Sequence, residues 1–99
     1  MVIRKLDGII EAVRYTADGN IALVRVYERR GAVWSDQVLL ERNELTDRLK
    51  QGKRFAIGER KIHLGGVFET GRLVYQAEGN IITEGKTGAR DLLIGVPVF

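Results

Sequence analysis

The chain has 99 residues, of which 44% are hydrophobic and 29% charged, a composition typical of one folded globular domain and unlike that of a disordered chain. It contains no cysteine, which excludes disulfides and thiolate metal sites and favours a reducing, cytoplasmic location. Sixteen basic against thirteen acidic residues give a net charge of +3, which permits an anionic partner but is modest for a dedicated nucleic-acid binder.

The first residues do not predict a membrane or export signal. Residues 1–7 lack the apolar core of a signal peptide, and no apolar run approaches the ~18 to 20 residues that a membrane span needs. We therefore expect no membrane partner.

Residues 9–40 predict three consecutive antiparallel strands. The runs 9–15 and 21–27 are rich in β-branched and aromatic residues and flank Asp18-Gly19, which is a hairpin signal. A three-residue loop there and a two-residue loop at Arg30-Gly31 fix the register. The expected rows of facing side chains on the core side are Tyr15–Ile21–Leu40, Val13–Leu23–Val38, Glu11–Arg25–Asp36 and Ile9–Tyr27–Trp34.

A short helix is expected near residues 44–51. Asn43 is a suitable N-cap, Gly52 can end the helix at C′, and Leu45 and Leu49 share one face. Two leucines are enough to cover a sheet edge or one end of a barrel.

The rest of the chain is predicted to be rich in hairpins. Residues 53–57 predict a strand ending at Gly58, segments 61–64 and 67–69 a hairpin, and Thr70-Gly71 a turn before strand 72–75. The sequence from Tyr15 to Ile21 recurs in similar form from Tyr75 to Ile81, which predicts the same turn used twice. By that count Tyr75 faces Ile81 and Leu73 faces Thr83.

The fold class is a single mainly β domain over 1–99, either a small antiparallel barrel or a strongly bent sheet, with one short helix. The order of three strands, a short helix and further strands resembles that of OB-folds, and an SH3-like barrel is the alternative. The apolar tail from Leu92 to Phe99 contains Pro97, which cannot donate to a ladder, so near its end it is at most an edge strand. It either completes its own domain or adds to the sheet of a partner protein or a second copy.

Cationic and aromatic residues gather around the second predicted hairpin and the start of the strand at 53. Aromatic stacking and cationic phosphate contacts are the means by which single strands are bound. The candidate ligand-binding or nucleic-acid-binding residues are Arg25, Tyr27, Arg29, Arg30, Trp34, Lys53 and Arg54. The predicted register opposes this interpretation, because it buries Tyr27 and Trp34.

The polar core row Glu11–Arg25–Asp36 has two interpretations. It is a structural ion triplet near the rim of the sheet. Alternatively, with the Tyr27–Trp34 pair, it forms the floor of a small ligand pocket.

Catalytic and metal chemistry are poorly supplied. His63 is the only histidine and Ser35 the only serine, and no spacing of metal ligands is present. Residues 79–87 depart from a phosphate-binding loop, because five residues instead of four separate Gly79 from Gly85. A looser anion contact by Lys86 and Arg90 is the alternative to a solvated loop.

We therefore expect a non-enzymatic protein-interaction or assembly module without a cofactor or metal. A single-stranded nucleic-acid binder is the alternative. The partner is then a protein or a second copy, through the tail, or a nucleic acid.

Overall fold

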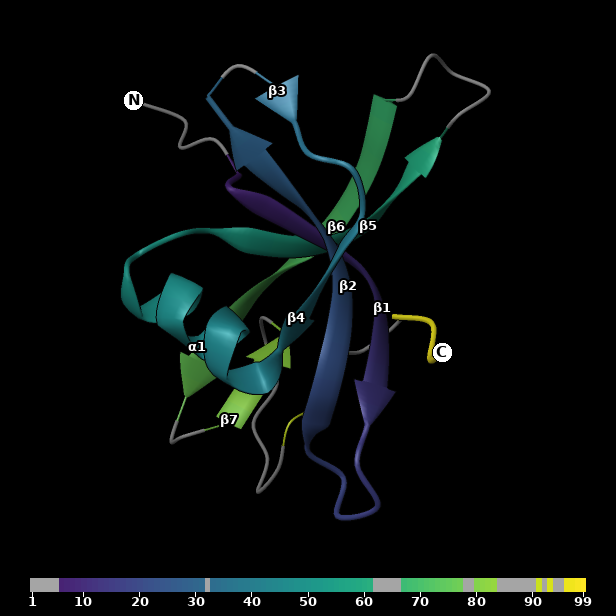
Figure 1. Ribbon diagram of the computed structural model, residues 1–99, viewed down its shortest axis with the longest axis vertical. Helices are drawn as coiled ribbons and strands as arrows, with labels where there is room; N and C mark the ends of the chain where they lie inside the picture. The colour runs from purple at the N-terminus through teal and green to yellow at the C-terminus, as the bar shows by residue number, and fades with distance from the viewer. Residues whose placement is uncertain are drawn as a thin grey trace.

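The computed structural model describes residues 6–31, 33–61, 67–77, 80–83, 91, 93 and 96–99. These form one strongly bent seven-stranded sheet with a single helix packed against it (Figure 1). The order along the sheet is β3-β2-β1-β5-β6-β7, and β4 pairs with β2 beyond β3. The bounds are β1 Gly8–Tyr15, β2 Ile21–Arg30, β3 Val33–Trp34, β4 Val38–Glu41, α1 Arg42–Lys50, β5 Phe55–Lys61, β6 Val67–Ala77 and β7 Asn80–Thr83.

The predicted mainly β class with one short helix is confirmed. A closed barrel is not confirmed, because within the described ranges no ladder joins β7 to β2, β3 or β4. The sheet is also not wholly antiparallel, because β1 and β5 pair in parallel through Ile9 and Ala56. A parallel pair requires a long crossover, and α1 lies in the connection that precedes β5.

The register of β1 against β2 is correct at both ends and wrong in the middle. Ile9 faces Tyr27 and Tyr15 faces Ile21, as predicted. Between them one register shift skips Glu11 and a second skips Ala22, so that Val13 faces Val24 and not Leu23. The two bulges compensate each other, because one inserts an extra residue in β1 and the other an extra residue in β2.

The predicted third strand is two strands with a different register. Arg30 pairs with Val33, so the loop is Gly31 and the next residue, and Gly31 takes the positive φ of 65°. The prediction placed the turn one residue too early, which would have put Arg30 in a conformation that favours glycine. Trp34 then faces Arg29 and not Tyr27. After a break, β4 pairs with β2 in a new register: Leu23 with Glu41, Val24 with Leu40, Arg25 with Leu39 and Val26 with Val38.

The second half of the sheet is simpler than predicted. β5 continues through Gly58, and β6 is one strand across the expected turn at Thr70-Gly71, which is a register shift instead. Tyr75 faces Ile82 and Val74 faces Thr83, because the loop between Ala77 and Asn80 has two residues where the first copy has three. The predicted pairs of Tyr75 and Leu73 are therefore wrong by one residue. Residues 62–66 of the predicted 61–64 and 67–69 hairpin lie outside the described residues.

Helix α1 begins two residues earlier than predicted. Its N-cap is Glu41 and not Asn43, and the Glu44 carboxylate accepts the Glu41 N–H at 3.0 Å. Its C-terminal end is as predicted: Gly52 has φ 85°, and the N–H groups of Gly52 and Lys53 donate to the carbonyls of Leu49 and Arg48 at 3.1 Å. These two bonds form a Schellman motif, which fixes the chain direction after the helix. Within the described residues no helix is long and apolar enough to cross a membrane.

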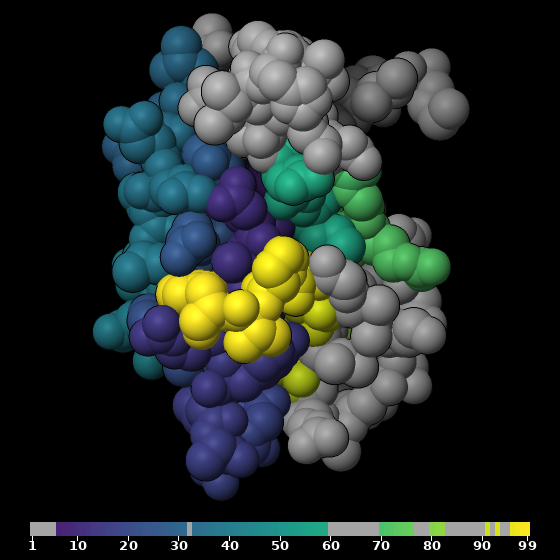
Figure 2. Space-filling model, turned by 90° about the vertical axis from the view of Figure 1, so that its right-hand side faces the viewer, coloured from purple at the N-terminus to yellow at the C-terminus, as the bar shows by residue number. Residues whose placement is uncertain are grey.

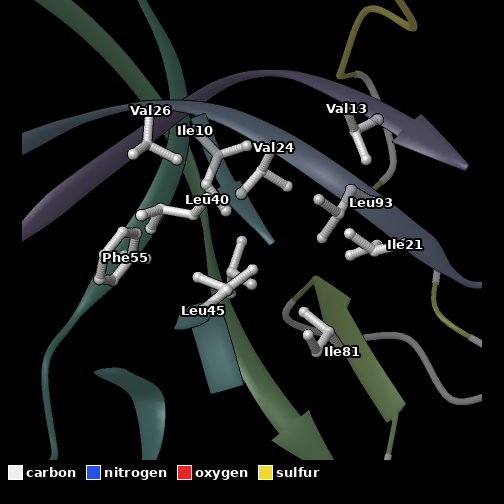
Figure 3. Close-up of a cluster of buried hydrophobic side chains, with 11 residues drawn as sticks. Ile10, Val13, Ile21, Val24, Val26, Leu40, Leu45, Phe55, Ile81 and Leu93 are labelled. Carbon is white, nitrogen blue, oxygen red and sulfur yellow. The ribbon is translucent and has the colours of Figure 1, made fainter. Parts of the chain in front are cut away.

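The hydrophobic core lies between the concave face of the sheet and α1. Leu45 is fully buried, and Leu49 packs at the margin, as their shared helix face predicted. Figure 3 shows Leu93, from the tail, between Val13 and Ile21. The core residues are Ile10, Val13, Ile21, Val24, Val26, Leu40, Leu45, Phe55, Val74, Ile81 and Leu93. The bulge at Glu11 explains why Ile10 and Val13 of β1 both face this core, and the bulge at Ala22 explains the same for Ile21 and Val24 of β2.

A buried carboxylate closes the gap between the two ends of the sheet. Asp91 accepts the N–H of Ile21, which begins β2, on Oδ2 and the N–H of Ile81, in β7, on Oδ1, both at 2.8 Å. Arg42 donates to the same two oxygens at 2.7 and 3.1 Å. Burial alone would raise the pKa of Asp91, but the hydrogen bonds from Arg42, Ile21 and Ile81 hold that pKa below its usual value.

Asp91 also joins the two copies of the repeated sequence, because Ile21 and Ile81 occupy the same position in each. One side chain therefore does part of what a closing strand ladder would do in a barrel. It satisfies one outward N–H on each side of the opening.

The C-terminal tail packs on its own chain. The Val13 N–H donates to Pro97 O at 2.9 Å, and the Phe99 N–H donates to Val13 O at 3.0 Å. Val98 thus forms a parallel bridge with Val13, and Figure 2 shows this tail (yellow) across β1 (purple). Leu93 is buried, and its N–H donates to the Tyr15 hydroxyl at 3.1 Å. The described residues of the tail thus pack on their own domain, which is the first of the two predicted alternatives, and they do so through one isolated bridge and not a strand.

Candidate functional site

A cationic hollow of about 380 Å³ lies where the end of β2, the end of α1 and the segment entering β5 meet. Four of its side chains are cationic and two are acidic, so its net charge is positive. We call it the cationic hollow, and its lining residues are Asp7, Glu28, Arg29, Arg30, Arg48, Gln51 and Lys53.

Arg29 is held by the segment before β1 and by β3. Its backbone N–H donates to Asp7 O at 2.8 Å, and its Nε donates to Leu6 O at 2.9 Å. Its guanidinium lies 4.8 Å from the centre of the Trp34 ring. This is a cation–π contact, and it places the only tryptophan beside the cationic hollow.

The other side of the cationic hollow comes from α1 and the turn after it. Arg48 Nε is 2.9 Å from Glu28 Oε1, and its Nη1 donates to Glu44 O at 3.3 Å. The Schellman motif then directs Lys53 into the lining. The cations are therefore carried on regular elements and a fixed turn, which limits the ordering that ligand binding would require.

Asp7, in the segment before β1, joins the lining of the cationic hollow to the segment that enters β5. Asp7 N–H donates to Arg54 O at 2.7 Å, and Asp7 Oδ2 accepts the Arg54 N–H at 2.8 Å.

Ser35 is the only serine. Its hydroxyl accepts the Glu28 N–H at 3.0 Å, and the same hydroxyl donates to Asp36 O at 2.8 Å. Ser35 thus has a structural role at the base of β2.

The structure brings together part of the predicted binding set. Arg29, Arg30 and Lys53 line the cationic hollow, and Trp34 contacts Arg29. Tyr27 is buried, as the predicted register required, whereas Trp34 is half-buried and lies away from Tyr27. Sequence reasoning missed Arg48 and Gln51. The position of Arg48 in the last helical turn was a usable signal, because that turn ends next to Lys53.

The predicted polar core row is wrong. The bulge at Glu11 removes it from Arg25, which faces Ala12 on one side and Leu39 on the other. Glu11 instead accepts a hydrogen bond from the Gln37 side chain, and Asp36 is exposed. The predicted ligand pocket required this row and the Tyr27–Trp34 pair to lie together, and the structure brings neither set together.

A second hollow of about 380 Å³ adjoins the cationic hollow and shares Lys53 with it. It lies beside the part of β6 that β5 does not reach, because the first β5 residue, Phe55, pairs with Val74. We call it the apolar hollow. Its lining residues are Leu49, Gly52, Lys53, Arg54, Phe55, Leu73, Val74, Tyr75 and Gln76.

The outer face of β1, β2 and β4 carries a different cluster. The ring of Phe99 has the guanidinium of Arg14 4.7 Å from its centre and that of Arg25 4.5 Å from it. Arg14 Nε also donates to Phe99 O at 3.0 Å. Next to these residues Leu39 is 54% exposed and Val98 68% exposed. We call Arg25, Leu39, Val98 and Phe99 the outer patch.

The described residues contain no candidate metal site. Among the residues that the structure describes, no group of three or more His, Asp or Glu side chains is arranged to hold a metal ion. His63, Lys86, Arg90 and the loop 79–87, apart from residues 80–83, lie outside the described residues.

Comparison with known proteins adds no family to this description. No protein-family profile, curated protein or solved structure matches the chain, so function is argued from the geometry of its own residues.

Proposed function

We propose that the protein is a non-enzymatic binding domain whose cationic hollow takes the sugar-phosphate backbone of single-stranded nucleic acid. The observation that carries this proposal is the convergence of Arg29, Arg30, Arg48 and Lys53 on one hollow. A chain of phosphates is the ligand that several fixed cations with a neighbouring aromatic ring recognise best.

The internal contacts of the cationic hollow support an extended anion more than a single buried one. Arg48 is paired with Glu28, and Arg29 is committed to Leu6 O and Trp34. Arg30 is exposed at the end of β2, so it can contact a strand that passes over the rim. The cytoplasmic location predicted from the absence of cysteine is compatible with this function and stays a prediction.

The proposal predicts salt-dependent binding that depends on this particular hollow. We expect Trp34 fluorescence to change on titration with oligothymidylate, with an affinity that falls steeply between about 50 and about 200 mM salt. The double variant Arg30→Gln, Lys53→Gln removes two cations, and because each phosphate contact contributes about 0.7 to the slope of log K against log salt, the slope should fall by about 1.4. The affinity at low salt should fall with it.

The matched control is the double variant Arg14→Gln, Arg25→Gln, which removes the same charge from the outer patch region. Both variants lose two positive charges, so a general effect of net charge would weaken binding equally in each. Equal weakening, or no fluorescence change in the parent protein at low salt, would contradict the proposal.

We also propose a protein-interaction function through the outer patch, with a second copy of the chain as the partner. The observation in its favour is the exposure of Leu39, which pairs with Arg25, and of Val98, which precedes Phe99 in the chain, while Arg25 lies over the Phe99 ring. Exposed apolar side chains grouped beside an aromatic ring and an arginine are typical of protein contacts.

This second proposal predicts self-association that the outer patch controls. The solution mass of the parent protein should rise with concentration, and Leu39→Lys should keep it at the mass of one chain, because a charge would be buried in the contact. Val33→Lys is the control, since Val33 is 64% exposed but lies on β3, away from the outer patch. A parent protein of monomer mass at every concentration would refute the proposal.

A further inference from the structure

We infer that the apolar hollow is a base-binding subsite, in which one base of the bound strand stacks on Tyr75. This inference rests on the proposed nucleic-acid function and specifies how that function is shared between two adjoining hollows. Tyr75 is 39% exposed and lines the apolar hollow beside Leu73 and Val74.

The fold leaves room for a planar ring at this position. The β5–β6 ladder starts at the pair Phe55–Val74, so among the described residues no strand pairs with β6 beyond Val74 on the side that faces β5. The hollow beside that edge is bounded by Leu49 of α1 and by Gly52, which has no Cβ to fill it. The floor is apolar, because Phe55 and Val74 are buried.

The charges beside the apolar hollow indicate which ligand it takes. Lys53 lines both hollows, and Arg54 lines the apolar one. Gln51 and Gly52, which are neighbours in the chain, line one hollow each. A nucleotide has the same two-part character, a phosphate joined to a flat ring, so a phosphate at Lys53 places its base toward Tyr75.

The committed occupant is therefore a base of a single strand. An aliphatic chain would also fit an apolar floor, but it would gain nothing from cations at the rim or from the flat face of an exposed tyrosine. Stacking is tolerant of sequence, because every base has a π face, so we expect little preference among bases.

The test compares two strands that differ only in their bases. One is oligothymidylate, and the other is an abasic strand of the same length and charge. Base–aromatic stacking is worth about 1–3 kcal/mol, so the parent protein should bind the base-bearing strand roughly 5- to 150-fold more tightly. Tyr75→Ala should remove most of this difference, whereas Tyr75→Phe should keep it, because the ring and not the hydroxyl provides the stacking.

The variants separate the two hollows. Arg30→Gln should weaken both strands by the same factor, because it acts on phosphates alone. Equal affinity of the parent protein for both strands, or an equal loss for both with Tyr75→Ala in a protein that still unfolds cooperatively, would overturn the subsite and leave the backbone site standing. If neither strand binds the parent protein at low salt, the proposed function is refuted, and the subsite with it.

Discussion

Replacing Asp91 with alanine is expected to cost about 3 to 5 kcal/mol of unfolding free energy, the usual result of removing one partner from a buried ion pair. The Asp91 side chain is fully buried and accepts hydrogen bonds from Arg42, Ile21 and Ile81. Alanine would leave two buried backbone N–H groups without their acceptor and would open the gap between β2 and β7. Urea unfolding monitored by circular dichroism measures the loss.

Two further variants test whether the carboxylate itself is responsible. Asp91→Asn keeps one acceptor oxygen and the size of the side chain, but its NH2 group would face either the Ile21 or the Ile81 N–H donor, so it should also destabilise although it opens no void. Asp36→Asn removes an exposed aspartate and should change stability by less than about 0.5 kcal/mol. Equal stability of the parent protein and Asp91→Ala would contradict the role assigned to this residue.

The same contact should make stability depend on acid. The pKa of Asp91 is lowered in the folded protein from its usual 3.8, so unfolded chains bind a proton more readily than folded ones. Its contribution is therefore complete above pH 3.8 and is lost as the pH falls through the lower folded value. The stability difference between the parent protein and Asp91→Asn should narrow in that range and stay constant near neutral pH.

Replacing Gly8 with alanine is expected to destabilise the protein by about 1 to 3 kcal/mol, through overpacking of a buried ring. A Cβ on Gly8 would lie 2.3 Å from Cε2 and 2.6 Å from Cδ2 and Cζ of Phe55. Phe55 is buried in the core, and Gly8 pairs with it across β1 and β5. Neither strand can move without disturbing the only parallel ladder between named strands in the described part of the sheet.

A double variant tests this contact directly. Phe55→Leu alone should destabilise by leaving a void, but in combination with Gly8→Ala it removes the clash, so the two losses should add to more than the loss of the double variant. Thermal or urea unfolding of the four proteins completes the cycle. Strict additivity would show that the Gly8 and Phe55 sites are independent and would contradict the packing argument.

The two hollows differ in how far the sequence pointed to them. Arg29, Arg30 and Lys53 were identified because cations and aromatics cluster around one hairpin and the chain after the helix. For Tyr75 the sequence predicts only the end of strand 72–75 and a place in the repeated turn. Tyr75 and Leu49 line the same hollow because β5 begins only at Phe55, opposite Val74. The start of β5 depends in turn on the connection through α1 that leads to it.

The sequence by itself determined the local elements. These are the strands over 9–15 and 21–27, the turn at Gly19, and a helix that Gly52 ends. Each follows from interactions between near neighbours in the chain, namely β-branched runs, the positive φ of glycine and the spacing of Leu45 and Leu49. The predicted pairs at the two ends of the first hairpin, Ile9 with Tyr27 and Tyr15 with Ile21, are correct for the same reason.

Only the tertiary structure decided the middle of the sheet and its closure. The bulge at Ala22 moves the partner of Val13 from Leu23 to Val24, and the bulge at Glu11 restores the predicted pairing at Ile9. Ala12 and Val13 are both buried in this arrangement. The buried Asp91 carboxylate accepts hydrogen bonds from Ile21, 70 positions earlier in the chain, and from Ile81, 10 positions earlier. A local pattern carries no information about such partners, because they meet only after the sheet has bent and desolvation has made an unpaired charge costly.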